Sequence, residues 1–169
     1  VNNRNFKKEA EFTEYITKKY PQIKTIIINH NPKNTNVILG RENETIYGPG
    51  YIYDILGDYK FKISPLSFYQ TNPTQTEALY EKGLEYAGLT GEETILDLYC
   101  GIGTIGIFAS KKAKKVYGIE IIENAIKNAK ENSKLNKIDN AEFYCGDVEE
   151  LLPQIVAKNN LKPETVFVD

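Results

Sequence analysis

A glycine-rich turn is the feature of the sequence whose residue types and spacing most clearly suggest chemistry. Gly101, Gly103 and Gly106 form a GxGxxG pattern between a predicted strand and a predicted helix. Glycine lets the backbone approach a ligand closely. Glu120 ends the next predicted strand, about 20 residues further on, where a carboxylate can accept hydrogen bonds from both hydroxyls of a ribose. The pattern predicts a nucleoside-binding site, although a glycine loop alone can also serve only to turn a tight corner.

Asp97, at the end of the strand that leads into this turn, separates two candidate cofactors. A dinucleotide such as NAD would bring its pyrophosphate towards this carboxylate, which would repel it. S-adenosylmethionine instead carries a positive sulfonium and a positive ammonium, and a carboxylate suits both. The sequence therefore favours S-adenosylmethionine over NAD, and we expect Gly101, Gly103 and Thr104 to lie against it together with Asp97 and Glu120.

A further acid, Asp147, follows the third predicted strand in the run Cys145-Gly146-Asp147. Methyltransferases often place an acid against the adenine at this position. Asp147 is equally a natural N-cap for the helix that follows. The sequence leaves both interpretations open.

Regular alternation of strands and helices must position these residues. We predict strands at 94–98, 115–119, 141–144 and 165–168, helices at 104–113 and 122–136, and a short helix after Asp147. Asn72 and Pro73 form a plausible helix start, and that helix ends near Gly88. Strands that alternate with helices of this length predict a parallel sheet. The expected fold is α/β, a Rossmann-like class I methyltransferase domain with a truncated parallel sheet.

Residues 1–70 show a different pattern of predicted elements. A helix is predicted over 5–20, followed by short β-rich runs at 23–28, 36–39, 45–47, 51–55 and 59–63, with a hairpin turn at 56–59. This pattern predicts a small, mostly antiparallel α+β unit. We therefore expect two domains, a β-rich unit over residues 1–70 and an S-adenosylmethionine-binding domain over 71–169.

Composition restricts the possible classes of protein. The 169 residues are 41% hydrophobic, enough for a sizeable core, and no apolar run approaches the roughly 20 residues that span a bilayer. The two cysteines lie far apart without a CxxC motif, so we expect no metal site. A cytoplasmic protein is expected. The net charge of −2 argues against a dedicated nucleic-acid binder. The absence of an initiator methionine and the final strand indicate a fragment.

Two longer motifs resemble one family. Residues 97–104, DLYCGIGT, resemble motif I of the RNA uracil-5-methyltransferases of the bacterial 23S rRNA and tRNA types. Residues 63–73, ISPLSFYQTNP, resemble the segment that leads into the methyltransferase domain of that family, and generic methyltransferases have no such run. The likeness continues upstream through residues 35–40 and so covers essentially the whole chain.

This resemblance implies specific roles. It places cofactor contacts at Gln70, Tyr99, Glu120 and Asp169, and it implies an RNA substrate, 23S rRNA more than tRNA. The nucleophilic cysteine and the glutamate base of the family would lie beyond Asp169, so the fragment is expected to bind the cofactor and to transfer no methyl group. A methyltransferase with another substrate is the alternative, and a non-catalytic RNA-binding or dehydrogenase-like domain is the third hypothesis.

The remaining reactive side chains have structural explanations. Cys100 lies in the glycine turn with no histidine or other base nearby in sequence, so we predict a small buried packing residue. Cys145 receives the same interpretation. His30 follows an isoleucine-rich run and is predicted to be a loop residue without a catalytic role.

Overall fold

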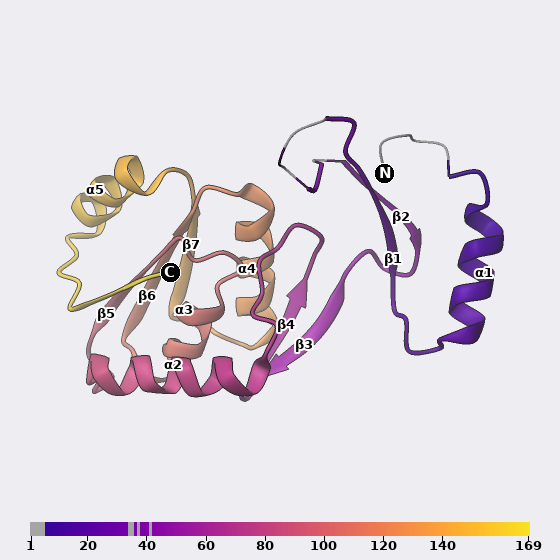
Figure 1. Cartoon of the computed structure of the whole chain (residues 1–169). Coiled ribbons are helices and arrows are strands. Elements are labelled where there is room, and N and C mark those ends of the chain that lie inside the picture. The colour runs from indigo at the N-terminus through magenta and orange to yellow at the C-terminus, as the bar shows by residue number, and fades with distance from the viewer. Residues whose placement is uncertain (1–5, 34–35, 37, 41) are drawn as a thin grey trace. The chain divides into compact units, whose positions relative to one another are not determined.

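A computed structural model describes residues 6–33, 36, 38–40 and 42–169 of the chain (Figure 1). The described residues form two compact units, one made of those up to Ile52 with Ser64–Leu66, the other of Tyr53–Ile63 with Ser67–Asp169. Residues 53–63 therefore pack with the later unit, whereas the pattern of short β-rich runs groups them with the earlier one.

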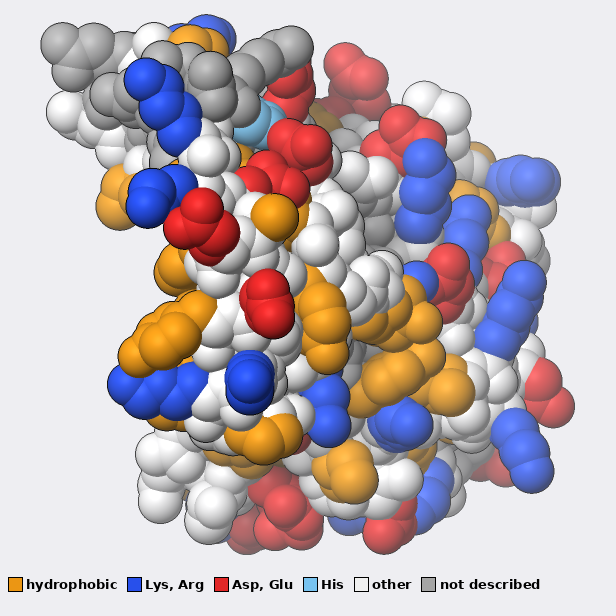
Figure 2. All heavy atoms as spheres, turned by 90° about the vertical axis from the view of Figure 1, so that its right-hand side faces the viewer, with side chains coloured by type: hydrophobic (Ala, Val, Ile, Leu, Met, Phe, Trp, Pro, Cys, Tyr) orange, Lys and Arg blue, Asp and Glu red, His pale blue; other side chains and the backbone are white. Residues whose placement is uncertain are grey.

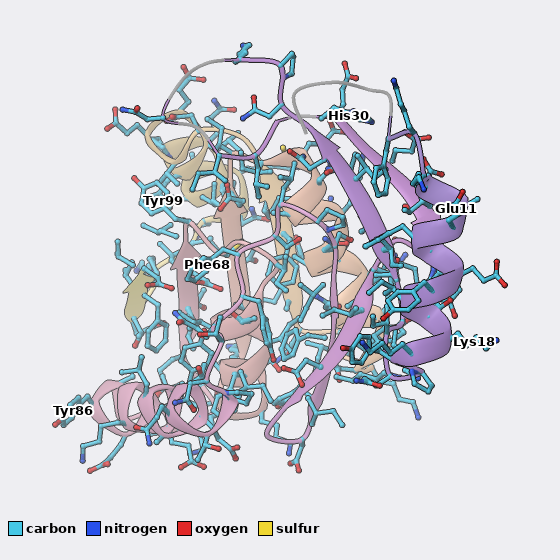
Figure 3. The ribbon with its side chains drawn as sticks, turned by 45° about the vertical axis from the view of Figure 1, so that its right-hand side comes forward. Glu11, Lys18, His30, Phe68, Tyr86 and Tyr99 are labelled. Atoms are coloured by element: carbon cyan, nitrogen blue, oxygen red, sulfur yellow. The ribbon has the colours of Figure 1, made fainter. Side chains whose placement is uncertain are left out.

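The first unit contains helix α1 (Glu9–Lys19) and the antiparallel strands β1 (Ile26–His30) and β2 (Glu42–Tyr47). Acidic residues in the first turn of α1 and lysines in its last turn complement the helix dipole, as Glu11 and Lys18 show in Figure 3. The helix confirms most of the prediction for residues 5–20, although residues 6–8 are not helical and Asn5 lies outside the described residues. Strand β1 starts and ends later than predicted. Of the run predicted at 36–39, residues 36, 38 and 39 are not in a strand, while Val37 lies outside the described residues.

The second unit is built on a parallel sheet. Its strands are β5 (Thr94–Leu98), β6 (Lys115–Glu120), β7 (Ala141–Cys145) and β8 (Thr165–Val168), in the order β7-β6-β5-β8. The α/β fold class and the parallel sheet are confirmed. Because the chain returns past β5 to add β8 on its other side, the strand order reverses beside β5. Open sheets of this type bind ligands at such a reversal, outside the carboxyl ends of the strands.

Helices α2 (Pro73–Ala87), α3 (Thr104–Ala109), α4 (Glu123–Leu135) and α5 (Val148–Asn159) connect or precede the strands. The predicted start of α2 is confirmed, since the Asn72 side chain accepts a hydrogen bond from the Gln75 N–H at 3.2 Å. Helix α3 is shorter than predicted and continues as a 3₁₀ turn over Ser110–Lys112. The Ser110 hydroxyl donates to the Ile107 carbonyl at 2.6 Å, a local bond of the kind that competes with regular helix.

Both faces of this sheet are covered (Figure 1). Alternate residues of a strand point to opposite faces. Leu96 and Ile119 belong to the cluster that packs against α5, whereas Ile95 and Val116 belong to a cluster with residues of α2 and α3. Asp97 shares the parity of Ile95, so its carboxylate points towards α3 and not α5.

A hairpin of β3 (Ile52–Leu56) and β4 (Tyr59–Ile63) packs on α4. Asn132 of α4 and Asn136, the C-cap residue of that helix, form hydrogen bonds with the backbone of β4 as a neighbouring strand would. The Asn132 amide accepts from the Lys62 N–H at 2.7 Å and donates to the Lys62 carbonyl at 3.3 Å. Asn136 makes the same pair of bonds to the backbone of Lys60, both at 2.8 Å. These bonds, with the burial of Leu56 and Phe61, explain why the hairpin belongs to the second unit.

The surface carries mixed charge. On the face that Figure 2 draws, lysines, carboxylates and apolar side chains are interspersed, in line with the net charge of −2. Within the described residues, no helix is long and apolar enough to cross a membrane.

Candidate functional site

A cavity of about 330 Å³ opens at the carboxyl ends of β5, β6 and β8. Its volume falls within the range of small-molecule sites. Seven of the nine predicted cofactor residues line it, namely Gln70, Asp97, Tyr99, Gly101, Thr104, Glu120 and Asp169. The structure therefore brings together residues that are up to 99 positions apart in the chain, from Gln70 to Asp169.

The glycine turn forms one wall of the cavity. Tyr99, Gly101 and Gly103 all have positive φ, at 61°, 53° and 79°. At Gly103 an added Cβ would lie 2.9 Å from the Phe143 ring, so glycine is required there by both conformation and space. Gly103 does not line the cavity but allows the turn to pack against the sheet. Tyr99 lines the cavity and is 51% exposed. Non-glycine residues with positive φ cluster at functional sites.

The backbone fixes Glu120 at the end of β6. One carboxylate oxygen accepts from the Gly101 N–H at 3.2 Å, and the other accepts from the Ile122 N–H at 2.9 Å. Each oxygen of a carboxylate can accept a second bond. The side chain is therefore held in one orientation and still able to bind a diol. Ile121 and Ile122, both more than half exposed, provide an apolar surface beside it.

Asp97 lies deeper, with only 1% of its surface exposed. Its carboxylate accepts a hydrogen bond from the Gly106 N–H of α3 at 2.8 Å, which ties the strand to the helix across the glycine turn. Burial raises the pKa of Asp97 to about 7, the Asp169 charge adds to the rise, and the Gly106 bond opposes it. Asp97 is thus a structural residue of the loop as well as a lining residue of the cavity.

The opposite wall comes from the segment before α2 and from α2 itself. Phe68, Tyr69 and Tyr80 line the cavity, and Phe68 is 70% exposed. Phe68 and Tyr99 are labelled in Figure 3, where both lie away from Tyr86 at the end of α2. The Tyr80 hydroxyl lies 3.1 Å from the Thr104 Oγ1, and burial raises the pKa of Tyr80. Burial likewise raises the pKa of Tyr69 to about 12.

Sequence reasoning did not identify these aromatic residues as parts of the site. Phe68 and Tyr69 stand in the motif that carries the family resemblance, which was a usable signal. Tyr80 belongs to the apolar face of an ordinary amphipathic helix, and no sequence pattern separates it from the core.

Asp147 lies outside the cavity. It is exposed, and its carboxylate accepts from the Glu149 N–H at 2.8 Å and the Glu150 N–H at 3.4 Å, which makes it the N-cap of α5. The N-cap interpretation is confirmed. A contact with adenine stays a prediction.

Two other expectations need correction. Cys145 is exposed and not a buried packing residue, because it ends an edge strand at the carboxyl side of the sheet. His30 is not in a loop but ends β1, where it is buried with its Nε2 3.1 Å from Glu44 Oε2. Cys100 is buried as predicted, and burial raises the pKa of its thiol far above the usual range. No group of three potential ligand side chains in the described ranges is arranged to hold a metal ion.

The family comparison agrees with this geometry. Residues 89–163 match a family model described as a methyltransferase domain. Together with the order of the parallel strands and the cavity at their carboxyl ends, the match defines the fold of the second unit as Rossmann-like, of the methyltransferase type.

Named relatives make the likeness more specific. A Bacillus cereus protein called an uncharacterized RNA methyltransferase is 52% identical over 156 residues, which cover 92% of this chain and 34% of that protein. A Clostridium acetobutylicum protein of the same description is 51% identical over 169 residues, covering 100% of this chain and 36% of that protein. The chain spans about a third of the length of these curated relatives. The predicted similarity to RNA methyltransferases is confirmed.

A solved structure is similar as well. The tRNA (uracil-54, C5)-methyltransferase of Pyrococcus abyssi, in complex with S-adenosyl-L-homocysteine, shares 34% sequence identity with a TM-score of 0.64. The similarity covers 78% of this chain and 32% of that one.

Proposed function

We propose that this chain supplies the S-adenosylmethionine site of an RNA methyltransferase that methylates uracil at C5. The observation that carries the proposal is the cavity at the strand-order reversal, where a glycine turn, an anchored Glu120 and buried Asp97 meet. The RNA-methyltransferase names of the relatives and the S-adenosyl-L-homocysteine complex of the Pyrococcus abyssi enzyme support it.

Each side chain has a role in this proposal. Glu120 binds the ribose hydroxyls with the free lone pairs of its fixed carboxylate, and the exposed Ile121 packs against the adenine. Gln70, Tyr99 and Asp169 contact the remainder of the cofactor. Holding the methyl donor in one orientation can account for about 7–11 kcal/mol of the barrier to a bimolecular reaction.

Uracil C5 is a weak nucleophile and needs activation. In the family that the sequence resembles, a cysteine thiolate adds to C6, C5 then takes the methyl group, and a base removes the C5 proton as the cysteine leaves. The target uracil must first leave the base stack of its RNA. Cys100 is buried with a raised pKa and does not suit this step. The proposal assigns the thiolate and the base to segments that follow Asp169 in the parent protein.

Calorimetry tests the cofactor assignment. We expect the chain to bind S-adenosylmethionine and S-adenosylhomocysteine and not NADH. Tighter binding of NADH would contradict the assignment and favour a dehydrogenase-like domain.

The substrate is tested on the parent protein. We expect labelled S-adenosylmethionine and unmodified 23S rRNA to give 5-methyluridine with the full-length protein and not with residues 1–169. Unmodified tRNA is the second substrate, because the Pyrococcus abyssi enzyme is named for a tRNA uracil. Methylation by residues 1–169 alone would refute the placement of catalysis, and a modified base other than uracil would refute the reaction.

A further inference from the structure

Three carboxylates converge on the cavity from three neighbouring strands. Asp97 comes from β5, Glu120 from β6, and Asp169 follows β8. No lysine, arginine or histidine is among the described residues that line the cavity. Carboxylates in one site disfavour each other's ionised form. The cavity therefore contains three carboxyl groups and no cationic side chain among its described lining residues.

The three carboxylates differ in their surroundings. Asp169 is exposed, and Glu120 accepts two backbone N–H groups. Asp97 is buried, and its carboxylate accepts a hydrogen bond from the Gly106 N–H. The titratable side chains that interact with it are Asp169, the Tyr80 hydroxyl of α2 and the Cys100 thiol, none of which is cationic. Glu120 lines the same cavity. Burial among such groups favours the protonated form of Asp97, and it raises the pKa of this carboxyl group to about 7.

We infer that Asp97 exchanges its proton for the positive charge of the cofactor, so that the carboxyl group is protonated in the empty site and ionised in the occupied one. The inference rests on the proposed function. The balance is simple: the O–H bond of Asp97 breaks, the proton goes to solvent, and the ligand cation takes its place as the counter-charge. No oxidant or other reactant is needed.

The affinity for S-adenosylmethionine is expected to increase with pH. A cation binds the ionised form better, and this form is populated as the pH rises through about 7. For one proton with that pKa, the dissociation constant of S-adenosylmethionine is expected to be about tenfold higher at pH 6 than at pH 8. An ordinary aspartate, with a pKa near 4, would give no change in this range.

Calorimetry at pH 7 in buffers of different ionisation enthalpy measures the proton directly. We expect about half a proton to be released for each S-adenosylmethionine or S-adenosylhomocysteine bound, since a group with a pKa of 7 is half protonated there. 5′-Methylthioadenosine, which has neither the sulfonium nor the amino-acid ammonium, should release none. Asp97→Asn should abolish the release, and Asp139→Asn, at an exposed loop position, should retain it.

The outcomes separate the two proposals. If none of the three ligands binds, the proposed function fails. If they bind without proton release, or if Asp97→Asn binds and releases the same proton, only the inference fails. Should Asp97→Asn not fold, the ¹³C shift of the Asp97 carboxyl group is followed against pH in the wild-type chain. Titration near neutral pH without ligand and below pH 5 with ligand supports the inference. Titration below pH 5 in the empty protein overturns it.

Discussion

Two strand-to-helix corners of the same sheet use a carboxylate in opposite ways. At the corner between β5 and α3, Asp97 is buried and reaches across the glycine turn to the Gly106 N–H. At the corner between β7 and α5, Asp147 is exposed and accepts from the first N–H groups of its own helix. The residue before α3 is Gly103, which offers no side chain to the helix start.

The difference shows how one fold makes an accessible corner and a capped corner from similar parts. A side chain that caps its own helix occupies the N–H groups that a ligand would otherwise approach. Moving the acid back into the strand and placing glycine before the helix leaves the turn accessible. The position of the carboxylate along the chain therefore decides whether the N–H groups at the helix start are capped or left accessible to a ligand.

Substitution of the first corner's buried glycine should have the largest effect. Gly103→Ala places a Cβ 2.9 Å from the Phe143 ring on a residue with φ of 79°. Left-handed strain and overpacking together are expected to lower the free energy of unfolding by roughly 2–5 kcal/mol. Gly88→Ala, at φ of 62° with open space around it, is the matched control and should lose only about 1 kcal/mol. Equal losses in urea denaturation would show that space at Gly103 does not matter.

The buried acid should make stability depend on pH. Because the pKa of Asp97 is raised to about 7, its contribution is present below pH 4 and is lost as the pH rises through 7. Relative to Asp97→Asn, the wild type should lose about 1 kcal/mol per pH unit, roughly 3 kcal/mol between pH 4 and 7. Denaturation of both proteins across this range measures the difference, which removes the shared contribution of other carboxylates. A constant difference would contradict the raised pKa.

At the end of β6, Glu120 is predicted to act on affinity. Glu120→Ala should weaken S-adenosylhomocysteine binding by about 1–3 kcal/mol, the usual contribution of hydrogen bonds to a charged group. The fold should survive, because the side chain lies at the ligand end of its strand. Calorimetry measures the affinity, and an unchanged value would remove Glu120 from the site.

At the corner between β7 and α5, substitution should affect stability and not affinity. Asp147→Ala removes the N-cap of α5 and is expected to lower the free energy of unfolding by about 1 kcal/mol. Affinity for S-adenosylhomocysteine should stay within the error of the measurement, since Asp147 does not line the cavity. A weaker affinity at full stability would instead support the contact with adenine.

The sequence predicted this fold well where the signals are local. Strands at 94–98 and 165–168 match residue for residue, because short apolar runs between turns and helices define their own limits. The membership of the hairpin 53–63 was not predictable, since it depends on Asn132 and Asn136, about 70 residues away. At the site, the types and order of the residues indicated a cofactor. The depth of Asp97 and the exposure of Cys145 depend on packing that no local pattern records.

The hydrogen bonds of the Asn132 and Asn136 side-chain amides to β4 also limit which substitutions these two positions can accept. An amide carries both a donor and an acceptor, so Asn132 and Asn136 each pair with an N–H and a carbonyl of the strand edge. A carboxylate or a lysine at either position would serve only one of them. The edge that these amides cover is closed to strand addition by another chain. Saturation mutagenesis scored by soluble expression should therefore find these two positions far less permissive than Lys130 and Lys134 on the same helix, with aggregates as the characteristic product of failure.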